Sequence, residues 1–146
     1  MGKKWMGFVG AVLCCLVMVS LSQAGGQKPP TGTVAINGLV WLKNANCFGE
    51  KTWDEAKADA ASLHTGMCGL TDGSAAGQWR LPTARELQSL SSYLGQLDNK
   101  PQSMIYWSSE ESTHFNESAV AVNITNYGIV EILIRKRFHV LPVHNP

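Results

Sequence analysis

The 146-residue sequence lacks the short motifs that mark the common enzyme classes. It holds no G-x-S-x-G elbow, no P-loop and no G-x-G-x-x-G fingerprint, which argues against the usual hydrolase and nucleotide-binding frameworks. Glu110 and Glu111 are adjacent, but neighbouring strand residues point to opposite faces and cannot flank one bond. The histidines fall in no catalytic frame and are expected at surface or loop positions: His64, His114, His139 and His144. We therefore predict a protein that is not an enzyme and needs no cofactor.

Cysteine is also scarce, with four residues in the whole chain. Cys14 and Cys15 lie inside an apolar leader, so only Cys47 and Cys68 remain for the folded part. The chain has no CxxC and no HxxxH pair, which argues against a zinc site, and Asp72 alone supplies too few oxygen ligands for calcium. An isolated pair in an exported protein is most often a disulfide, so we predict a bond between the two remaining cysteines and no metal.

The first 24 residues have the three parts of a secretory signal peptide. Lys3 and Lys4 supply the positive start, residues 6–21 form an apolar core, and Ser22-Gln23-Ala24 supplies small residues for cleavage. The 16 apolar residues are fewer than the about 20 that a membrane-spanning helix needs. We predict cleavage at the end of this segment (residues 1–24), no membrane span in the remaining chain, and a secreted, periplasmic or cell-surface location.

The chain that remains after cleavage has little charge of either sign in excess. The full sequence carries a net charge of +1, and loss of the two leader lysines takes it from +1 to −1. Nucleic-acid binders usually carry a strong basic excess, so this balance argues against a nucleic-acid partner. Residues 25–33, rich in Gly and Pro, are predicted to form a flexible N-terminus ahead of one domain, residues 34–146.

Turn and capping signals predict the first half of the fold. Asn37-Gly38 divides two β-rich runs and predicts a hairpin. Thr52 begins a helix, and Glu55 three residues on completes a capping box. After a Gly-rich loop, Thr83 and Glu86 repeat this capping pattern for a second helix. The residues expected on buried helix faces are Trp53, Ala56, Ala60 and Leu63 in the first helix, and Leu87, Leu90 and Leu94 in the second.

The second half of the chain alternates apolar and polar residues with the period of β-strands. Residues 105–112 predict one strand, and residues 118–125 and 129–137 predict a hairpin. Residues 138–143 predict a last strand. The order of strand, helix, helix and then antiparallel strands is typical of the α+β class.

Candidate binding residues are aromatic or basic. Trp41 and Trp79 lie in short apolar runs and are expected in the core, while Arg80 needs water or an acidic partner. Trp107 precedes polar residues and is the candidate exposed aromatic side chain, which would stack on a sugar ring. The only dense positive charge is the run Arg135-Lys136-Arg137. This run suits a sulfated or other anionic glycan, or else forms a solvated strand end.

Several of these segments together resemble the Lcl-type C-terminal domain, a family named for the C-terminal region of a bacterial collagen-like adhesin. The matching motifs are "GLVWLKNANC", "CGLTDGSAAGQWRLPTAREL", "YWSS" and "VLPV", in that order. The resemblance implies a C-type-lectin-like α+β fold, in which two helices flank antiparallel sheets and the chain ends lie close together. It also implies bacterial export, a cysteine pair at Cys47 and Cys68, and an association with sulfated polysaccharides.

We therefore predict an exported bacterial recognition domain without catalytic activity, which binds glycans or other surface ligands as an adhesin does. The residues predicted to contact the ligand are Trp107, Arg135, Lys136 and Arg137. The alternative is a structural or assembly subunit of a surface filament or envelope complex, whose loops would bind an envelope protein instead of sugar.

Overall fold

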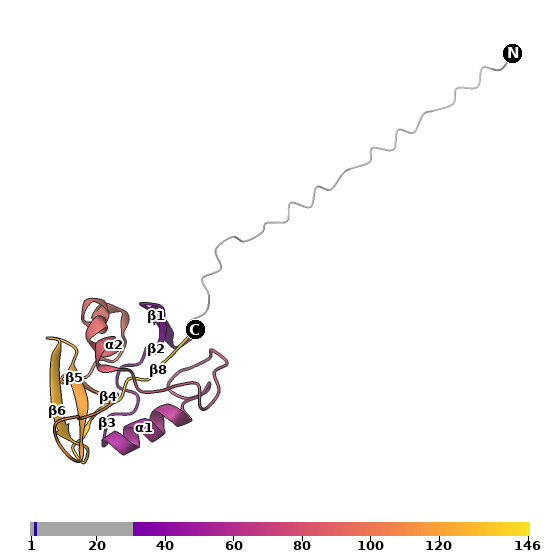
Figure 1. Ribbon diagram of the computed structural model, residues 1–146. Helices are drawn as coiled ribbons and strands as arrows, with labels where there is room; N and C mark the ends of the chain where they lie inside the picture. The colour runs from indigo at the N-terminus through magenta and orange to yellow at the C-terminus, as the bar shows by residue number, and fades with distance from the viewer. Residues whose placement is uncertain (1, 3–30) are drawn as a thin grey trace.

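The computed structural model describes residue 2 and residues 31–146, which contain two β-sheets and two α-helices (Figure 1). Residue 2 apart, the predicted signal peptide lies outside the described residues, as does most of the predicted flexible N-terminus. Within the described part of the chain, no helix has the length and apolar character needed to cross a membrane.

Main-chain hydrogen bonds already hold the chain at Thr31 and Gly32, which lie within the predicted flexible N-terminus. The Thr31 carbonyl accepts a hydrogen bond from the Thr71 N–H at 3.0 Å, and the Gly32 carbonyl accepts one from the Lys43 N–H at 2.9 Å. These main-chain bonds hold the end of the predicted flexible segment against the domain, because each carbonyl replaces water with a fixed donor.

A three-stranded antiparallel sheet brings the two ends of the described chain together. Its order is β1 (Thr33–Ile36), β2 (Leu39–Leu42) and β8 (Val143–His144), so the first and last strands flank β2 (Figure 1). Asn37 and Gly38 connect β1 to β2 with φ angles of 52° and 76°. Two positive φ angles are the requirement of the tight hairpin turn, so the predicted hairpin is confirmed.

Both α-helices begin with the predicted capping boxes. The helices are α1 (Trp53–Ser62) and α2 (Ala84–Ser89). In each, the threonine hydroxyl accepts the N–H of the glutamate three residues on, and the glutamate carboxylate accepts the threonine N–H. The pairs are Thr52 with Glu55, and Thr83 with Glu86. Helix start positions are thus confirmed.

The second helix is shorter than the sequence predicts. After Ser89 the chain tightens into the 3₁₀ helix η1 (Leu90–Gln96), and Leu94 is only partly buried while Leu90 is fully buried. The hydroxyls of Ser89 and Ser91 donate to main-chain carbonyls. The bond from Ser89 to Glu86 spans one turn and competes with regular helical geometry at the end of α2.

The larger sheet has five strands and is mixed, not purely antiparallel. In spatial order the strands are β3 (Glu50–Lys51), β7 (Phe138–His139), β4 (Ile105–Glu111), β5 (Ser118–Asn123) and β6 (Gly128–Leu133). The predicted β5–β6 hairpin is confirmed, with every residue of the two strands paired. The β4–β7 pair is parallel, with Tyr106 opposite His139. His139 is buried there, so its predicted surface position is wrong.

Residues 138–143 do not form the single last strand that alternation predicts. They begin in β7 of the larger sheet and reach β8 of the smaller one. Between the two strands, Val140 enters one hydrophobic cluster and Leu141 enters the other. Pro142 follows, and its missing N–H prevents continuation of one ladder. The segment therefore crosses from one sheet to the other.

Two hydrophobic clusters lie on opposite faces of the larger sheet. Alternate residues of β5 face the two clusters: Val120 and Val122 enter the larger one, and Ala119 and Ala121 the smaller one beneath α1. Small alanines under α1 permit the helix to pack closely against the sheet. One sheet thus contributes buried side chains to both hydrophobic clusters.

The segment Trp79-Arg80-Leu81 joins the two cores. Trp79 enters the larger cluster, which also contains Trp41, whereas Leu81 enters the smaller one. The Arg80 N–H and carbonyl both bond with Val143, each at 2.9 Å, which fastens the segment to β8. The prediction that Trp41, Trp79 and Leu81 are core residues is confirmed.

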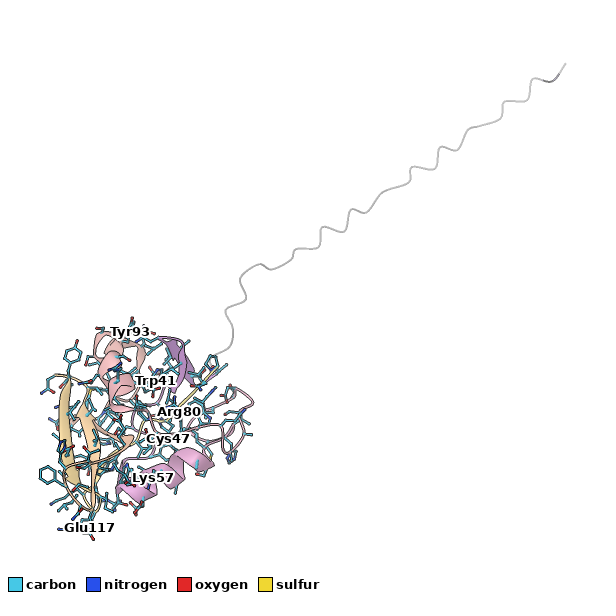
Figure 2. The ribbon with its side chains drawn as sticks, viewed as in Figure 1. Trp41, Cys47, Lys57, Arg80, Tyr93 and Glu117 are labelled. Atoms are coloured by element: carbon cyan, nitrogen blue, oxygen red, sulfur yellow. A yellow bond between two sulfur atoms is a disulfide. The ribbon has the colours of Figure 1, made fainter. Side chains whose placement is uncertain are left out.

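The predicted disulfide is present between Cys47 and Cys68, whose Cα atoms are 5.6 Å apart. It links the loop after β2 to the Gly-rich loop after α1, and both cysteines pack against the larger hydrophobic cluster. Figure 2 shows Cys47 between the two α-helices, within the body of the fold. The bond therefore closes the segment that contains β3 and α1, and it fixes the two loops that flank them.

Candidate functional site

Trp107 is not an exposed aromatic platform. Its side chain is 0% exposed and belongs to the smaller cluster, with its ring edge-on to Phe138 at 5.1 Å between centroids. The indole N–H donates to the Lys51 carbonyl at 2.7 Å. The predicted role of Trp107 in stacking on a ligand is wrong, because both the ring face and the polar edge are already occupied.

The three predicted cationic residues lie together in the turn that joins β6 to β7. We call Arg135, Lys136 and Arg137 the basic turn. All three are exposed, and the Lys136 N–H donates to the Leu133 carbonyl at 2.9 Å, which closes the turn. The structure therefore brings the cationic candidates together and separates them from the buried Trp107.

The three cations of the basic turn are not equivalent. The Arg137 guanidinium donates to the Glu50 carbonyl at 3.0 Å and lies 3.4 Å from the Glu55 carboxylate. The side chains of Arg135 and Lys136 have no hydrogen bond or ion pair with the residues that the structure describes. Arg137 consequently fastens the turn to the start of α1, and the other two cations are available to a ligand.

The carboxylate of Glu55 connects the basic turn to the helix cap. The Thr52 N–H holds the pKa of Glu55 below its ordinary value, with a smaller contribution from the Arg137 guanidinium. The carboxylate thus stays charged at neutral pH and keeps Arg137 in place. This arrangement gives the turn a fixed orientation, although each contact is solvent-exposed and weak by itself.

A loop of residues 112–117 lies beside the basic turn and borders a hollow of about 270 Å³. The Ile134 N–H donates to the Glu117 carbonyl at 2.9 Å, which connects the loop to the turn. In Figure 2, Glu117 lies at the end of the larger sheet. The lining residues are Trp53, Glu111, Ser112, Phe115, Asn116, Glu117, Ser118 and Ile134.

The sequence interpretation did not identify Phe115 as a surface aromatic residue. Its side chain is 60% exposed, whereas Trp107, the chosen candidate, is buried. The available signal was its place in the polar loop "STHFNES", since a large aromatic residue between turn-forming residues has no strand or helix face to join.

Charge divides this end of the molecule into two parts. Glu111 and Glu117 border the hollow, while Arg135 and Lys136 project from the basic turn. An anionic group is attracted to the turn and repelled by the hollow, because opposite charges favour contact and like charges oppose it. Within residues 31–146, no group of three His, Cys, Asp or Glu residues is placed to hold a metal ion.

The fold and this site define a small disulfide-bonded α+β domain with an exposed cationic turn. The sequence model of the Lcl C-terminal domain matches residues 33–144, so the chain belongs to the Lcl C-terminal domain family. No curated protein matches the sequence. Among solved structures, a chain of the complex between a mutant von Willebrand factor A1 domain and botrocetin is similar over 82% of this chain and 99% of that chain. The sequence identity is 16% and the TM-score is 0.46.

Proposed function

We propose that this protein is an exported recognition domain without catalytic activity, and that it binds anionic glycans through the basic turn. Its fold would be of the C-type-lectin-like kind, with the two chain ends side by side. Membership of the Lcl C-terminal domain family supports a recognition role. The Cys47–Cys68 disulfide supports export, since such bonds persist in oxidising compartments.

The observation that carries the proposal is the pair of unpartnered cations in the basic turn. Arg135 and Lys136 are exposed and meet no carboxylate among the described residues. A guanidinium binds a sulfate or carboxylate group with two parallel hydrogen bonds, and an ammonium adds a point charge. A sulfated glycan carries anionic groups on neighbouring sugar residues. Arg135 and Lys136 are two neighbouring cations, and each can bind one such group.

The turn is held in place before a ligand arrives. Arg137 is bound to Glu50 and Glu55, and Ile134 is bound to Glu117. A site that is already ordered loses little conformational entropy on binding. With two free cations at the surface, we expect modest affinity that falls as salt is added, because exposed charges are screened over about 10 Å at 0.1 M salt.

Chromatography of the exported chain on a heparin column, followed by a glycan array, tests the proposal. We expect retention at low salt, and we expect the double variant Arg135→Ala, Lys136→Ala to elute at clearly lower salt. The matched control is Arg85→Ala, Lys100→Ala, which removes the same charge from exposed positions outside the turn. Absence of retention at low salt, or equal weakening by both double variants, would contradict the proposal.

Export has its own experiment. When the full sequence is expressed in a bacterium, we expect the processed protein to begin at Gly25 and to be recovered from the periplasm, the medium or the cell surface. N-terminal sequencing with cell fractionation measures both outcomes. An unprocessed chain in the cytoplasm would contradict export and would leave the glycan experiment on the purified domain unaffected.

A further inference from the structure

The exposed large hydrophobic side chains of the described chain gather at one edge of the larger sheet. They are Phe115 at 60%, Tyr127 at 55%, Ile129 at 54% and Val130 at 37% exposure. Ile129 and Val130 belong to β6, Tyr127 directly precedes it, and Phe115 shares a shallow groove with three β6 residues. Figure 1 shows β6 as the outermost strand of the sheet. We call these four side chains and the free side of β6 the β6 edge.

The central part of β6 also carries free main-chain groups on its outer side. The Ile134 N–H donates directly across to the Glu117 carbonyl, which makes that opposed pair a hydrogen-bonded one. Bonded and non-bonded pairs alternate along an antiparallel ladder. Continuing the β5–β6 register, Val130 and Ile132 bond toward β5, so the main-chain groups of Ile129 and Glu131 point outward and are free. Leu133 also points outward, but its carbonyl already accepts the Lys136 N–H.

The free main-chain groups of Ile129 and Glu131, in a strand of six residues, form a template for another strand. The other sheet edges of the described chain are shorter: β1 has four residues, and β3 and β8 have two each. The four exposed side chains leave roughly 400 Å² of apolar area in water along this edge. Ile129 and Val130 are neighbours in the strand, so this area is divided between the two faces of the sheet. The total is about half of the ~800 Å² that each partner buries in a standard interface, before the backbone is counted.

We propose that β6 pairs antiparallel with β6 of a second copy of this chain, about a two-fold axis at Val130. The outward-pointing residues determine this register. Ile129 of each copy lies opposite Glu131 of the other, and these pairs use the free main-chain groups on both sides. Val130 lies opposite Val130 as a non-hydrogen-bonded pair, and the two larger sheets become one continuous sheet.

This register also satisfies the side chains. Tyr127 lies in the turn before β6, with a φ of 62° and its carbonyl bonded to the Gln88 amide, so it takes no part in the strand pairing. Its ring lies at the end of the edge that meets Leu133 of the other copy, beside the groove that Phe115 shares with Leu133. The two-fold axis therefore brings the end of the edge that holds Tyr127 in one copy toward the end that holds Phe115 in the other. Burial of these rings is the main favourable contribution, since aromatic side chains dominate interface energetics.

The charges of the edge are compatible with self-pairing. Glu131 faces Ile129 of the other copy and not Glu131, so like charges are not directly opposed. His114 lies 2.9 Å from Glu131 and covers its carboxylate on the same copy. Arg135 and Lys136 lie beyond the end of β6, outside the paired region, so glycan binding and dimer formation can fail independently.

Sedimentation velocity of the exported chain over a concentration series tests the proposal. We expect a monomer–dimer equilibrium that Val130→Lys shifts to monomer, because the two-fold axis brings the two new charges together. The control Ser92→Lys adds the same charge on the exposed side of η1 and should leave the dimer unchanged. Circular dichroism confirms that each variant is folded. A chain that stays monomeric throughout, or a dimer that Val130→Lys leaves intact, would overturn the proposal.

Cysteine cross-linking tests the register in folded protein, because each variant changes only one exposed residue of β6. Val130→Cys places two Cα atoms about 4.5 Å apart across the axis, within the range of a disulfide. Ile129→Cys places its two Cα atoms roughly 8 Å apart, beyond the ~7 Å limit. We expect rapid oxidation to a covalent dimer for Val130→Cys and little for Ile129→Cys. Equal rates for the two variants, or capture of other polypeptides in place of a second copy, would overturn the assigned pairing.

Discussion

Arg80 and Glu86 form a bidentate ion pair in which the two terminal guanidinium nitrogens each donate to one carboxylate oxygen at 2.9 Å. The same carboxylate accepts the Thr83 N–H at 2.8 Å and so completes the cap of α2. One side chain therefore joins the start of a helix to the segment that connects the two cores. The acidic partner that the sequence requires for Arg80 is Glu86.

Breaking this pair should destabilise the fold more than breaking an ordinary surface pair. For Arg80→Ala we expect a loss of about 1–2 kcal/mol in the free energy of unfolding, because the two bonds are charge-assisted and orient the helix cap. Asp98→Asn, which breaks the exposed pair with Lys43, should cost less than about 0.5 kcal/mol. Urea denaturation measures both, and equal effects would show that the Arg80 pair has no special role.

Acid should weaken the Arg80–Glu86 connection in a predictable direction. The Arg80 guanidinium, followed by the Thr83 N–H, holds the pKa of Glu86 below its ordinary value of 4.5. The folded chain therefore binds this proton less tightly than the unfolded chain, and the stability contributed by Glu86 is lost as pH falls below about 4.5. Thermal unfolding between pH 6 and 3 should show a shallower decline for Glu86→Gln than for the native sequence.

His139 should make the fold sensitive to mild acid. Burial lowers the pKa of His139 below its ordinary value of 6.5, although the Glu50 carboxylate at 3.8 Å opposes that effect. Because the unfolded chain takes up the proton first, the free energy of unfolding should fall as the pH drops below about 6.5. Melting temperatures from pH 8 to 5 should flatten in His139→Gln and keep their slope in the exposed control His64→Gln.

Trp107 should matter for stability and not for binding. Trp107→Ala is expected to cost about 3–5 kcal/mol, since it opens a cavity and leaves the Lys51 carbonyl without its donor. The milder Trp107→Phe should lower stability while keeping heparin retention unchanged. Arg135→Ala should show the reverse pattern, with retention lowered and stability kept. If a folded Trp107→Phe protein loses heparin retention, Trp107 contributes to binding and the prediction is wrong.

The disulfide should contribute substantially to stability. The two cysteines are 21 residues apart in sequence, and closing a loop of that length stabilises by about 3 kcal/mol in the chain-entropy description. We expect the double variant Cys47→Ala, Cys68→Ala to unfold at lower denaturant concentration by that amount. The native chain in a reducing agent should match the double variant, and no change on reduction would contradict the prediction.

Sequence reasoning succeeded where a few neighbouring residues decide the structure. Thr52 and Glu55 make their capping contacts within one helical turn, and Asn37-Gly38 forms its turn without help from distant residues. It failed for Trp107, whose neighbours Lys51 and Phe138 are distant in the chain. The alternation around Trp107 is the same for a buried and an exposed face, so only strand order distinguishes them.

For the candidate site, the sequence predicted the position of the basic turn but not the contacts that its side chains make. The basic turn is visible as a run of charge, because three adjacent cations cannot all be buried. Its division into one bound arginine and two free cations depends on Glu50 and Glu55, which reach the turn only after β3 pairs with β7. Sequence alone could not show which cation is committed.

The sequence by itself determined the helix starts, the first hairpin and the pairing of its two remaining cysteines. Each follows from local geometry or from the lack of any other partner in the folded part. Only the tertiary structure decided that residues 138–144 divide between two sheets and that Trp107 is buried. It also decided that Phe115 joins the residues of β6 at an open edge. These outcomes depend on which strands become neighbours. The strand order is fixed because the larger sheet must bury a hydrophobic cluster on each of its two faces.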